Sequence, residues 1–435
     1  MTNFRSPKLV KRYDYSYYDL DSPLDSTVEN DATQKKENYT FSVDNTSETN
    51  PFDWYNAYLE INFKPVKLDD GTGIDAGANG GNQDGTTTNV EIECNGTSVY
   101  SNPTANETTN ILKLLNYSKR YTDTVGKDQF FYPDTSGVTE AREFMADATN
   151  HTVRRRKNYN EGFSKRKSLT SDAANIVKFT LPLNSYSYFN AFKNNIHPNS
   201  EKINFTIEND NNMIHRKTAV GACKVILAKF RLWVPTLTFN GAGMEVYAEN
   251  YLTPKPWSYL NEHYVKEDSE LTESFRTIRD LRKSRHVFVW IISEGRYYDQ
   301  ENNSFTFDTF RRIGANGAKL SQAHLEINNN KHYPKIDLQY DNIARLYKTL
   351  LSYNSSYNNF LSGTIIDRTN YEKLHGILYF DLRNQEEDTK DSTVTLTFRY
   401  KLNEDPGSKY RLIFLILHEK EIELYISSGK LLLKA

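Results

Sequence analysis

The stretch that decides the fold lies in the second half of the chain and runs Arg285-His286-Val287-Phe288-Val289-Trp290-Ile291. Similar short apolar runs follow it between polar loops: Phe305-Thr306-Phe307-Asp308, Gly376-Ile377-Leu378-Tyr379-Phe380-Asp381-Leu382-Arg383 and Val394-Thr395-Leu396-Thr397-Phe398-Arg399-Tyr400. Branched and aromatic residues of this kind favour extended strands. Because no alternating helical pattern separates these strands, the sequence predicts an all-β sandwich or jelly roll and not a parallel α/β sheet.

The first half of the chain carries the same kind of pattern. Residues 58–67 alternate apolar with polar, and the Asn95-Gly96 pair after residues 90–94 is typical of a hairpin turn. Further strands are expected in three apolar runs, at 176–183, 203–207 and 224–234. Each half also places a short helix in a loop, near 111–115 and at 343–351. Near the end of the chain, 411–417 and 422–426 are expected to form a hairpin.

The composition excludes several classes of protein. Apolar residues make up 37% of the 435, and the longest apolar runs, such as 412–417, are far shorter than the ~20 residues of a spanning helix, so no membrane span is expected. The first residues lack the apolar region of a secretory signal. A net charge of −2 argues against a general nucleic-acid binder. Cys94 and Cys223 are too few for a disulfide framework and are expected to be small buried side chains.

One basic cluster is the candidate functional site of the sequence. Seven of the fourteen positions from 154 to 167 are cationic: Arg154, Arg155, Arg156, Lys157, Lys165, Arg166 and Lys167. Such a density of positive charge can bind phosphates of packaged DNA or serve as a nuclear import signal. The alternative interpretation is a solvated loop that is extended by the repulsion between its own charges.

No motif supports catalysis, a cofactor or a metal. The run His418-Glu419-Lys420-Glu421-Ile422 begins like a zinc-protease helix, but Ile422 occupies the place of the second histidine ligand. The stretch 71–76 fits a loose dinucleotide pattern, yet the glycines after it break the helix that such a site needs. His324 and Glu326 alternate onto one strand face, and a metal there is an alternative to solvated side chains. The acidic loop residues 69, 70 and 75 depart from the order of a calcium loop.

As an ordered series, these fragments resemble the double jelly-roll major capsid proteins of Polinton/adintovirus-type double-stranded DNA viruses, including those of virophages. The resemblance in the second half rests on residues 285–289, Phe307-Asp308, Tyr333-Pro334, Phe380-Asp381-Leu382 and Tyr400-Lys401-Leu402. In the first half it rests on residues 58–61, Asn95-Gly96, 179–183 and 232–235. Together the fragments span most of residues 55–418. The glycine-rich loop at 69–88 and the polar stretch 123–171 depart from the pattern.

The resemblance implies two tandem eight-stranded jelly rolls with short helices in the loops. The expected boundaries are an N-terminal arm at 1–50, a first jelly roll at 51–236, a connector at 237–283 and a second jelly roll with a C-terminal tail at 284–435. It further implies a non-enzymatic virion subunit that forms homotrimers with a pseudo-hexameric outline. These would tile an icosahedral shell around double-stranded DNA together with penton or minor capsid proteins. Assembly is expected in the nucleus or cytoplasm of a host cell.

Two other functions fit the same strands. A jelly-roll carbohydrate-binding protein or hydrolase is the first, because abundant Tyr and Trp can stack on sugars. A domesticated or transposon-encoded capsid-like protein is the second, and neighbouring genes for a packaging ATPase and a protease would distinguish it from an active virus.

Overall fold

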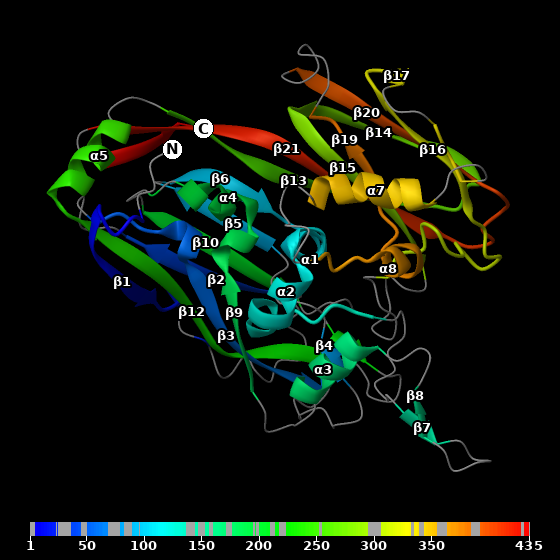
Figure 1. The fold of residues 1–435 in the computed structure, drawn as a ribbon, viewed down its shortest axis with the longest axis horizontal. Coiled ribbons are helices and arrows are strands. Elements are labelled where there is room, and N and C mark those ends of the chain that lie inside the picture. Colours follow the sequence, from blue (N-terminus) through cyan, green and yellow to red (C-terminus); the bar gives the residue numbers. More distant parts are fainter. Residues whose placement is uncertain are drawn as a thin grey trace.

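The structure is a computed structural model of the chain. It describes residues 5–22, 24, 36–44, 50–67, 79–81, 89–94, 96–135, 144–146, 153–155, 160–170, 176–194, 196, 200–208, 214–216, 223–251, 255–294, 306–331, 335–338, 343–354, 363–383, 392–427 and 430–434. These residues form four large antiparallel sheets, two in each half of the chain, with short helices at the edges (Figure 1).

The first half forms one jelly roll. Its first sheet has the order β1 (Val10–Tyr18), β12 (Cys223–Phe239), β3 (Tyr58–Lys67) and β9 (Val177–Pro182). Its second sheet has the order β2 (Lys36–Val43), β10 (Glu201–Glu208), β5 (Asn89–Cys94) and β6 (Thr97–Asn102). When these eight strands are lettered B to I along the chain, the sheets are B-I-D-G and C-H-E-F, which is the jelly-roll arrangement.

The second half repeats this order strand for strand. Its B-I-D-G sheet consists of β13 (Lys255–Ser269), β21 (Tyr410–Ser427), β15 (Ser284–Ser293) and β19 (Leu378–Asp381). Its C-H-E-F sheet consists of β14 (Glu273–Arg282), β20 (Thr393–Leu402), β16 (Leu320–Ile327) and β17 (Asn330–Lys331). Two further strands join the sheets: β18 (Ile336–Asp337) pairs with β16, and β22 (Lys430–Lys434) pairs with β21. The prediction of two tandem eight-stranded jelly rolls is confirmed.

The helices lie mainly in the loops between strands. They are α1 (Ala105–Asn116), α2 (Lys119–Tyr121), α3 (Glu161–Thr170), α4 (Ser187–Asn190), α5 (Gly241–Tyr251), α7 (Ile343–Asn354) and α8 (Arg368–Lys373), with the shorter turns η2 (Trp54–Asn56), η3 (Thr122–Gly126), η4 (Leu183–Ser185) and η5 (Ala191–Asn194). The helices predicted near 111–115 and at 343–351 are confirmed as α1 and α7. Two small strand pairs complete the structure: β4 (Asn79–Gly81) with β11 (Ile214–Arg216), and β7 (Phe144–Ala146) with β8 (Val153–Arg155). None of the helices in the described residues has the length and apolar character needed to cross a membrane.

Three expectations about the chain's organisation are wrong. The predicted arm at 1–50 contains β1 and β2, which pair with β12 and β10 and so belong to the first jelly roll. The predicted connector at 237–283 contains β13 and β14, the first two strands of the second jelly roll. The expected C-terminal hairpin is instead one strand, because β21 continues through His418 to Lys420 and pairs with β13 from Tyr410 to Leu424.

A hairpin forms where the Asn95-Gly96 pair predicts one. Strands β5 and β6 pair across it, and Gly96 has a positive φ of 76°. That backbone conformation is open to glycine at little cost.

The two long strands β13 and β21 tie the jelly rolls together. Figure 1 shows this ribbon extending from the second jelly roll toward α5 across the first. Trp257, Tyr259 and Ile422 from the ribbon are buried in the hydrophobic core of the first jelly roll. The indole of Trp257 stacks on Phe192, with 4.2 Å between ring centroids. Burial of these rings makes the two domains one packed unit.

Candidate functional site

The structure divides the predicted basic cluster into separate elements. Arg154 and Arg155 lie on β8, and Lys165, Arg166 and Lys167 lie on α3. Arg156 and Lys157 fall outside the described residues. Lys165 is exposed, as a phosphate contact requires, whereas Arg166 is buried.

Arg166 is a structural residue, so the prediction that it contacts nucleic acid is corrected. Its side chain is 1% exposed, and Nη2 lies 2.7 Å from Oδ1 of the buried Asp134. Nη1 donates a hydrogen bond to the carbonyl oxygen of Tyr132. The helix packs tightly here, since a Cβ on Gly162 would lie 2.1 Å from the carbonyl oxygen of Pro133. Such a cationic partner stabilises a buried carboxylate.

The predicted histidine and carboxylate on one strand face do come together. His324 Nε2 lies 3.2 Å from Glu326 Oε1, and Arg399 Nε lies 3.0 Å from the other oxygen of Glu326. The guanidinium therefore neutralises the carboxylate from β20. Within the described residues no group of three or more His, Cys, Asp or Glu side chains is placed to hold a metal ion. His332 and the acidic and glycine-rich loop at 69–76 lie outside the described residues.

Cys94 is a fully buried side chain on β5, in agreement with its predicted role as a small core side chain. Strand β12 begins at Cys223, whose side chain lies outside the described part of the structure.

Polar side chains also join the two jelly rolls, and no pattern along the chain indicates their pairing. Glu262 on β13 is 6% exposed, and its carboxylate accepts hydrogen bonds from Tyr100 Oη at 3.0 Å and from Ser187 Oγ, both in the first jelly roll. Burial is the largest influence and raises the pKa of Glu262, although these two hydrogen bonds act in the opposite direction. Tyr259 Oη and Lys420 Nζ both donate to the carbonyl oxygen of Val99.

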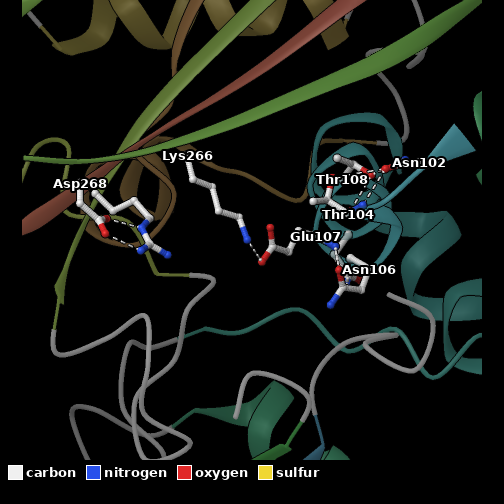
Figure 2. A network of polar contacts seen from close by, with 9 residues as sticks. Asn102, Thr104, Asn106, Glu107, Thr108, Lys266 and Asp268 are labelled. Carbon is white, nitrogen blue, oxygen red and sulfur yellow. Dashed lines mark hydrogen bonds and ion pairs between the residues drawn. The ribbon is translucent and has the colours of Figure 1, made fainter. Parts of the chain in front are cut away.

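A salt bridge extends this junction toward its solvent-exposed side. Figure 2 shows Lys266 of β13 reaching Glu107 at the start of α1, with 2.8 Å between Nζ and Oε1. Beside it, Asn102 Nδ2 donates to Thr108 Oγ1 at 2.8 Å and so fixes the first turn of α1. The junction therefore combines buried rings with a continuous set of polar contacts.

The outer face of the first B-I-D-G sheet carries a row of aromatic side chains, here called the aromatic face: Tyr15, Tyr17, Tyr58 and Trp233. Tyr17 pairs with Trp233 across β1 and β12, and Trp233 pairs with Tyr58 across β12 and β3. Tyr15 and Tyr17 are each 52% exposed. The Arg231 guanidinium carbon lies 4.2 Å from the centroid of the Tyr17 ring. Tyrosine, tryptophan and arginine are the residues that contribute most to protein–protein interfaces.

A smaller exposed surface lies on the outer face of the second C-H-E-F sheet. Phe275 of β14 is 56% exposed, and its ring lies 4.9 Å from the guanidinium carbon of Arg399. A groove of about 290 Å³ runs beside these two residues and His324.

Similar solved structures come from viruses. A chain in a cryo-EM structure of the Sputnik virophage is 12% identical with a TM-score of 0.61, and the match covers 100% of this chain and 90% of that chain. The Faustovirus major capsid protein gives 9% identity and a TM-score of 0.55, with 98% and 92% covered. The mavirus major capsid protein gives 11% identity and a TM-score of 0.50, with 97% and 90% covered. At such identities the likeness shows the shared fold alone.

The sequence itself matches no family model and no curated protein. The double jelly roll therefore rests on strand order and on whole-length structural similarity, and both give the same architecture.

Proposed function

We propose that this chain is a major capsid protein whose homotrimers have a pseudo-hexameric outline and tile an icosahedral shell around double-stranded DNA. The observation that carries this proposal is the tandem repeat of one strand order, B-I-D-G with C-H-E-F, in two jelly rolls packed as a single unit. Three such chains around an axis present six similar domains, which is the outline that hexagonal tiling requires.

The exposed surfaces support self-association. A cyclic trimer uses two different surfaces on each subunit, one meeting the other on its neighbour. The aromatic face on the first jelly roll is a suitable surface, because Tyr15 and Tyr17 are each 52% exposed. The indole of Trp233 is already hydrogen-bonded within the chain, since Nε1 donates to Glu60 Oε2 at 3.0 Å. A neighbour can therefore cover this indole without leaving its N–H unpaired.

The proposal extends to finer points that the resemblance in the sequence supports. The protein would be of the Polinton/adintovirus type, would act without catalysis, and would meet penton or minor capsid proteins at the vertices. It would reside in the virion after assembly in the host nucleus or cytoplasm. Lys165 and the arginines of β8 would provide weak contact with packaged DNA or an import signal, without Arg166.

Oligomeric state tests the proposal directly. We expect the full-length chain to form trimers in mass photometry and analytical ultracentrifugation, and to form hexagonal capsomers or shells in negative-stain micrographs. A chain that stays monomeric at micromolar concentration, with no capsomers on the grid, would contradict the proposal.

A further inference from the structure

The two jelly rolls line a cavity of about 770 Å³ where they meet, here called the junction cavity. One wall comes from α1, α2, η4, α4 and η5 of the first jelly roll, and the other comes from β13, α7 and β21 of the second. Small-ligand sites typically occupy about 300–1,000 Å³ and occur preferentially between domains. Both the size and the position of the junction cavity are therefore those of a ligand site.

The charge on its walls is positive. Lys113 of α1 is 2% exposed and Lys193 of η5 is exposed, and both line the cavity. Among the lining residues, all of which the structure describes, Glu419 is the one carboxylate. It is already held by Arg285, with 2.6 Å between Nη2 and Oε2. An anionic group would therefore be favoured inside the cavity.

Two polar atoms of the wall are buried and have no hydrogen-bond partner among the described residues, namely Asn116 Oδ1 and Ser185 Oγ. Leaving such an atom unpaired costs about 1–3 kcal/mol, so each requires an explanation. The amide oxygen can only accept, while the hydroxyl can donate and accept. A ligand that carries its own hydroxyl groups would satisfy both.

Three tyrosines of the wall have their hydroxyl groups engaged by other residues of the chain. Tyr117 Oη donates to Gln129 Oε1 at 2.7 Å, Gln129 Nε2 donates to Tyr121 Oη at 2.9 Å, and Tyr259 Oη is bonded to the carbonyl of Val99. With these hydroxyls engaged, the rings are left to make apolar contacts. The C–H faces of a sugar ring are suited to such contacts.

We propose that the junction cavity binds a small acidic sugar, a monosaccharide-sized ring bearing a carboxylate or phosphate. Lys193 pairs with the anionic group, Asn116 Oδ1 accepts from a sugar hydroxyl, and Ser185 Oγ bonds a second hydroxyl. The tyrosine rings pack against the ring carbons. This site lies within a single subunit, so it does not depend on the proposed capsid function, and it would add ligand binding to a shell protein.

Ligand-observed NMR and calorimetry on the full-length chain test the site with three probes: glucuronic acid, glucose 6-phosphate and glucose. We expect at least one acidic sugar to bind about tenfold more tightly than glucose, which is the effect of one favourable ionic contact. A preference for glucuronic acid would indicate that the natural ligand is the acidic end of a glycan. A preference for glucose 6-phosphate would indicate that the natural ligand is a sugar phosphate.

Variants locate the binding. Ser185→Ala and Lys193→Gln should each weaken binding of the acidic sugar about tenfold, whereas Lys202→Gln, on β10 and outside the cavity lining, should leave it unchanged. Lys193 is exposed and Ser185→Ala removes one atom, so both variants are expected to fold. The proposal would be overturned if neither acidic sugar bound at millimolar concentration, or if glucose bound as tightly as the acidic sugars. It would also be overturned if neither variant changed the affinity.

Discussion

The two B-I-D-G sheets share one strand order but differ in what covers their outer faces. In the second jelly roll, Phe288 and Trp290 of β15 are 0% and 1% exposed, because Tyr353 of α7 packs on the first ring and Phe307 packs on the second. Figure 1 shows α7 beside β15. On the same outer face of the first jelly roll, Tyr15 and Tyr17 of the edge strand β1 are each 52% exposed, and Tyr58 of β3, the strand equivalent to β15, is partly exposed. One sheet is thus a core layer, and the other is a surface.

The difference follows from where the helices lie. Tyr353 of α7 packs 5.0 Å from Phe288, measured between ring centroids, and Leu350 beside it is fully buried. Helix α1 leaves the first jelly roll and contributes its apolar residues, such as Leu115, to the core of the second. The same fold therefore uses its loops to cover one face and to leave the equivalent face open to a partner.

The largest expected effect is the loss of stability on substituting an aromatic residue, which should be greater in the second B-I-D-G sheet than in the first. Trp290→Ala should lower the free energy of unfolding by about 3–5 kcal/mol, because it opens a cavity between Tyr264 and Phe307. Trp233→Ala on the aromatic face should cost about 1 kcal/mol, since its side chain is already partly exposed. Guanidinium denaturation followed by circular dichroism measures both. Equal losses would mean that the aromatic face is as much a core layer as its counterpart.

A second contrast between covered and open positions lies on α3. Arg166→Met should cost about 3 kcal/mol because it leaves Asp134 buried without a cation, and local unfolding of the helix limits the loss. Lys165→Met, one residue earlier and exposed, should stay within about 0.5 kcal/mol. Thermal denaturation of the two variants side by side would test this. If the Arg166 variant were as stable as the Lys165 variant, the buried ion pair would not be needed for stability, and Arg166 would again be a candidate for contact with phosphate.

These contrasts explain how much of the molecule its sequence could predict. Apolar runs such as 285–291 and 394–400 are buried on most of their length, and they were predicted as strands. Strand β1 was missed although Tyr13, Tyr15 and Tyr17 alternate as they do in a strand. Because one face of its sheet is open to solvent, β1 contains many polar residues, and this composition resembles that of an extended arm. Strand β13 was missed for a similar reason, since Glu262 and Lys266 interrupt its apolar pattern to bind the first jelly roll.

The candidate site shows a different limit. A dense basic cluster is visible in the sequence, but the burial of Arg166 depends on Asp134, 32 residues away, and no local pattern marks that pair. The aromatic face and the junction cavity likewise gather residues from strands and helices far apart in the chain. Local patterns predicted most of the strands and helices, whereas the pairing of their side chains required the three-dimensional structure.

A smaller effect concerns the junction between the two sheets and depends on pH. Burial raises the pKa of Glu262, so its protonated form favours the folded state. That contribution is complete below the ordinary glutamate pKa of 4.5 and is lost as the pH rises through the raised value in the folded protein. Glu262→Gln keeps an acceptor for Tyr100 and Ser187 but cannot ionise.

We therefore expect Glu262→Gln to gain stability relative to the unmodified protein between pH 4 and pH 8, by about 1.4 kcal/mol for each unit by which the pKa is raised. Denaturation curves at both pH values measure this difference, with the exposed Glu273→Gln as the control. A difference independent of pH would show that Glu262 ionises at the junction as it does in water, and that the polar contacts there do not constrain it.

The smallest effect on stability, and the sharpest on assembly, is expected at the aromatic face. Replacing Tyr15 and Tyr17 together with Ser should change the free energy of unfolding by no more than about 0.5 kcal/mol, because both rings are largely in water in the single chain. If a neighbouring subunit covers this face, the same change should weaken the trimer at least about tenfold, since exposed tyrosines that become buried at an interface contribute most of its affinity. Mass photometry over a dilution series measures that shift, and Phe275→Ser, a similarly exposed ring on the second jelly roll, is the matched control.

A double variant that forms trimers as well as the unmodified chain would place the subunit contact elsewhere and leave the open sheet without a partner. A Phe275 variant that fails equally would show that both jelly rolls contribute open faces to assembly, and the contrast between them would then be confined to the junction.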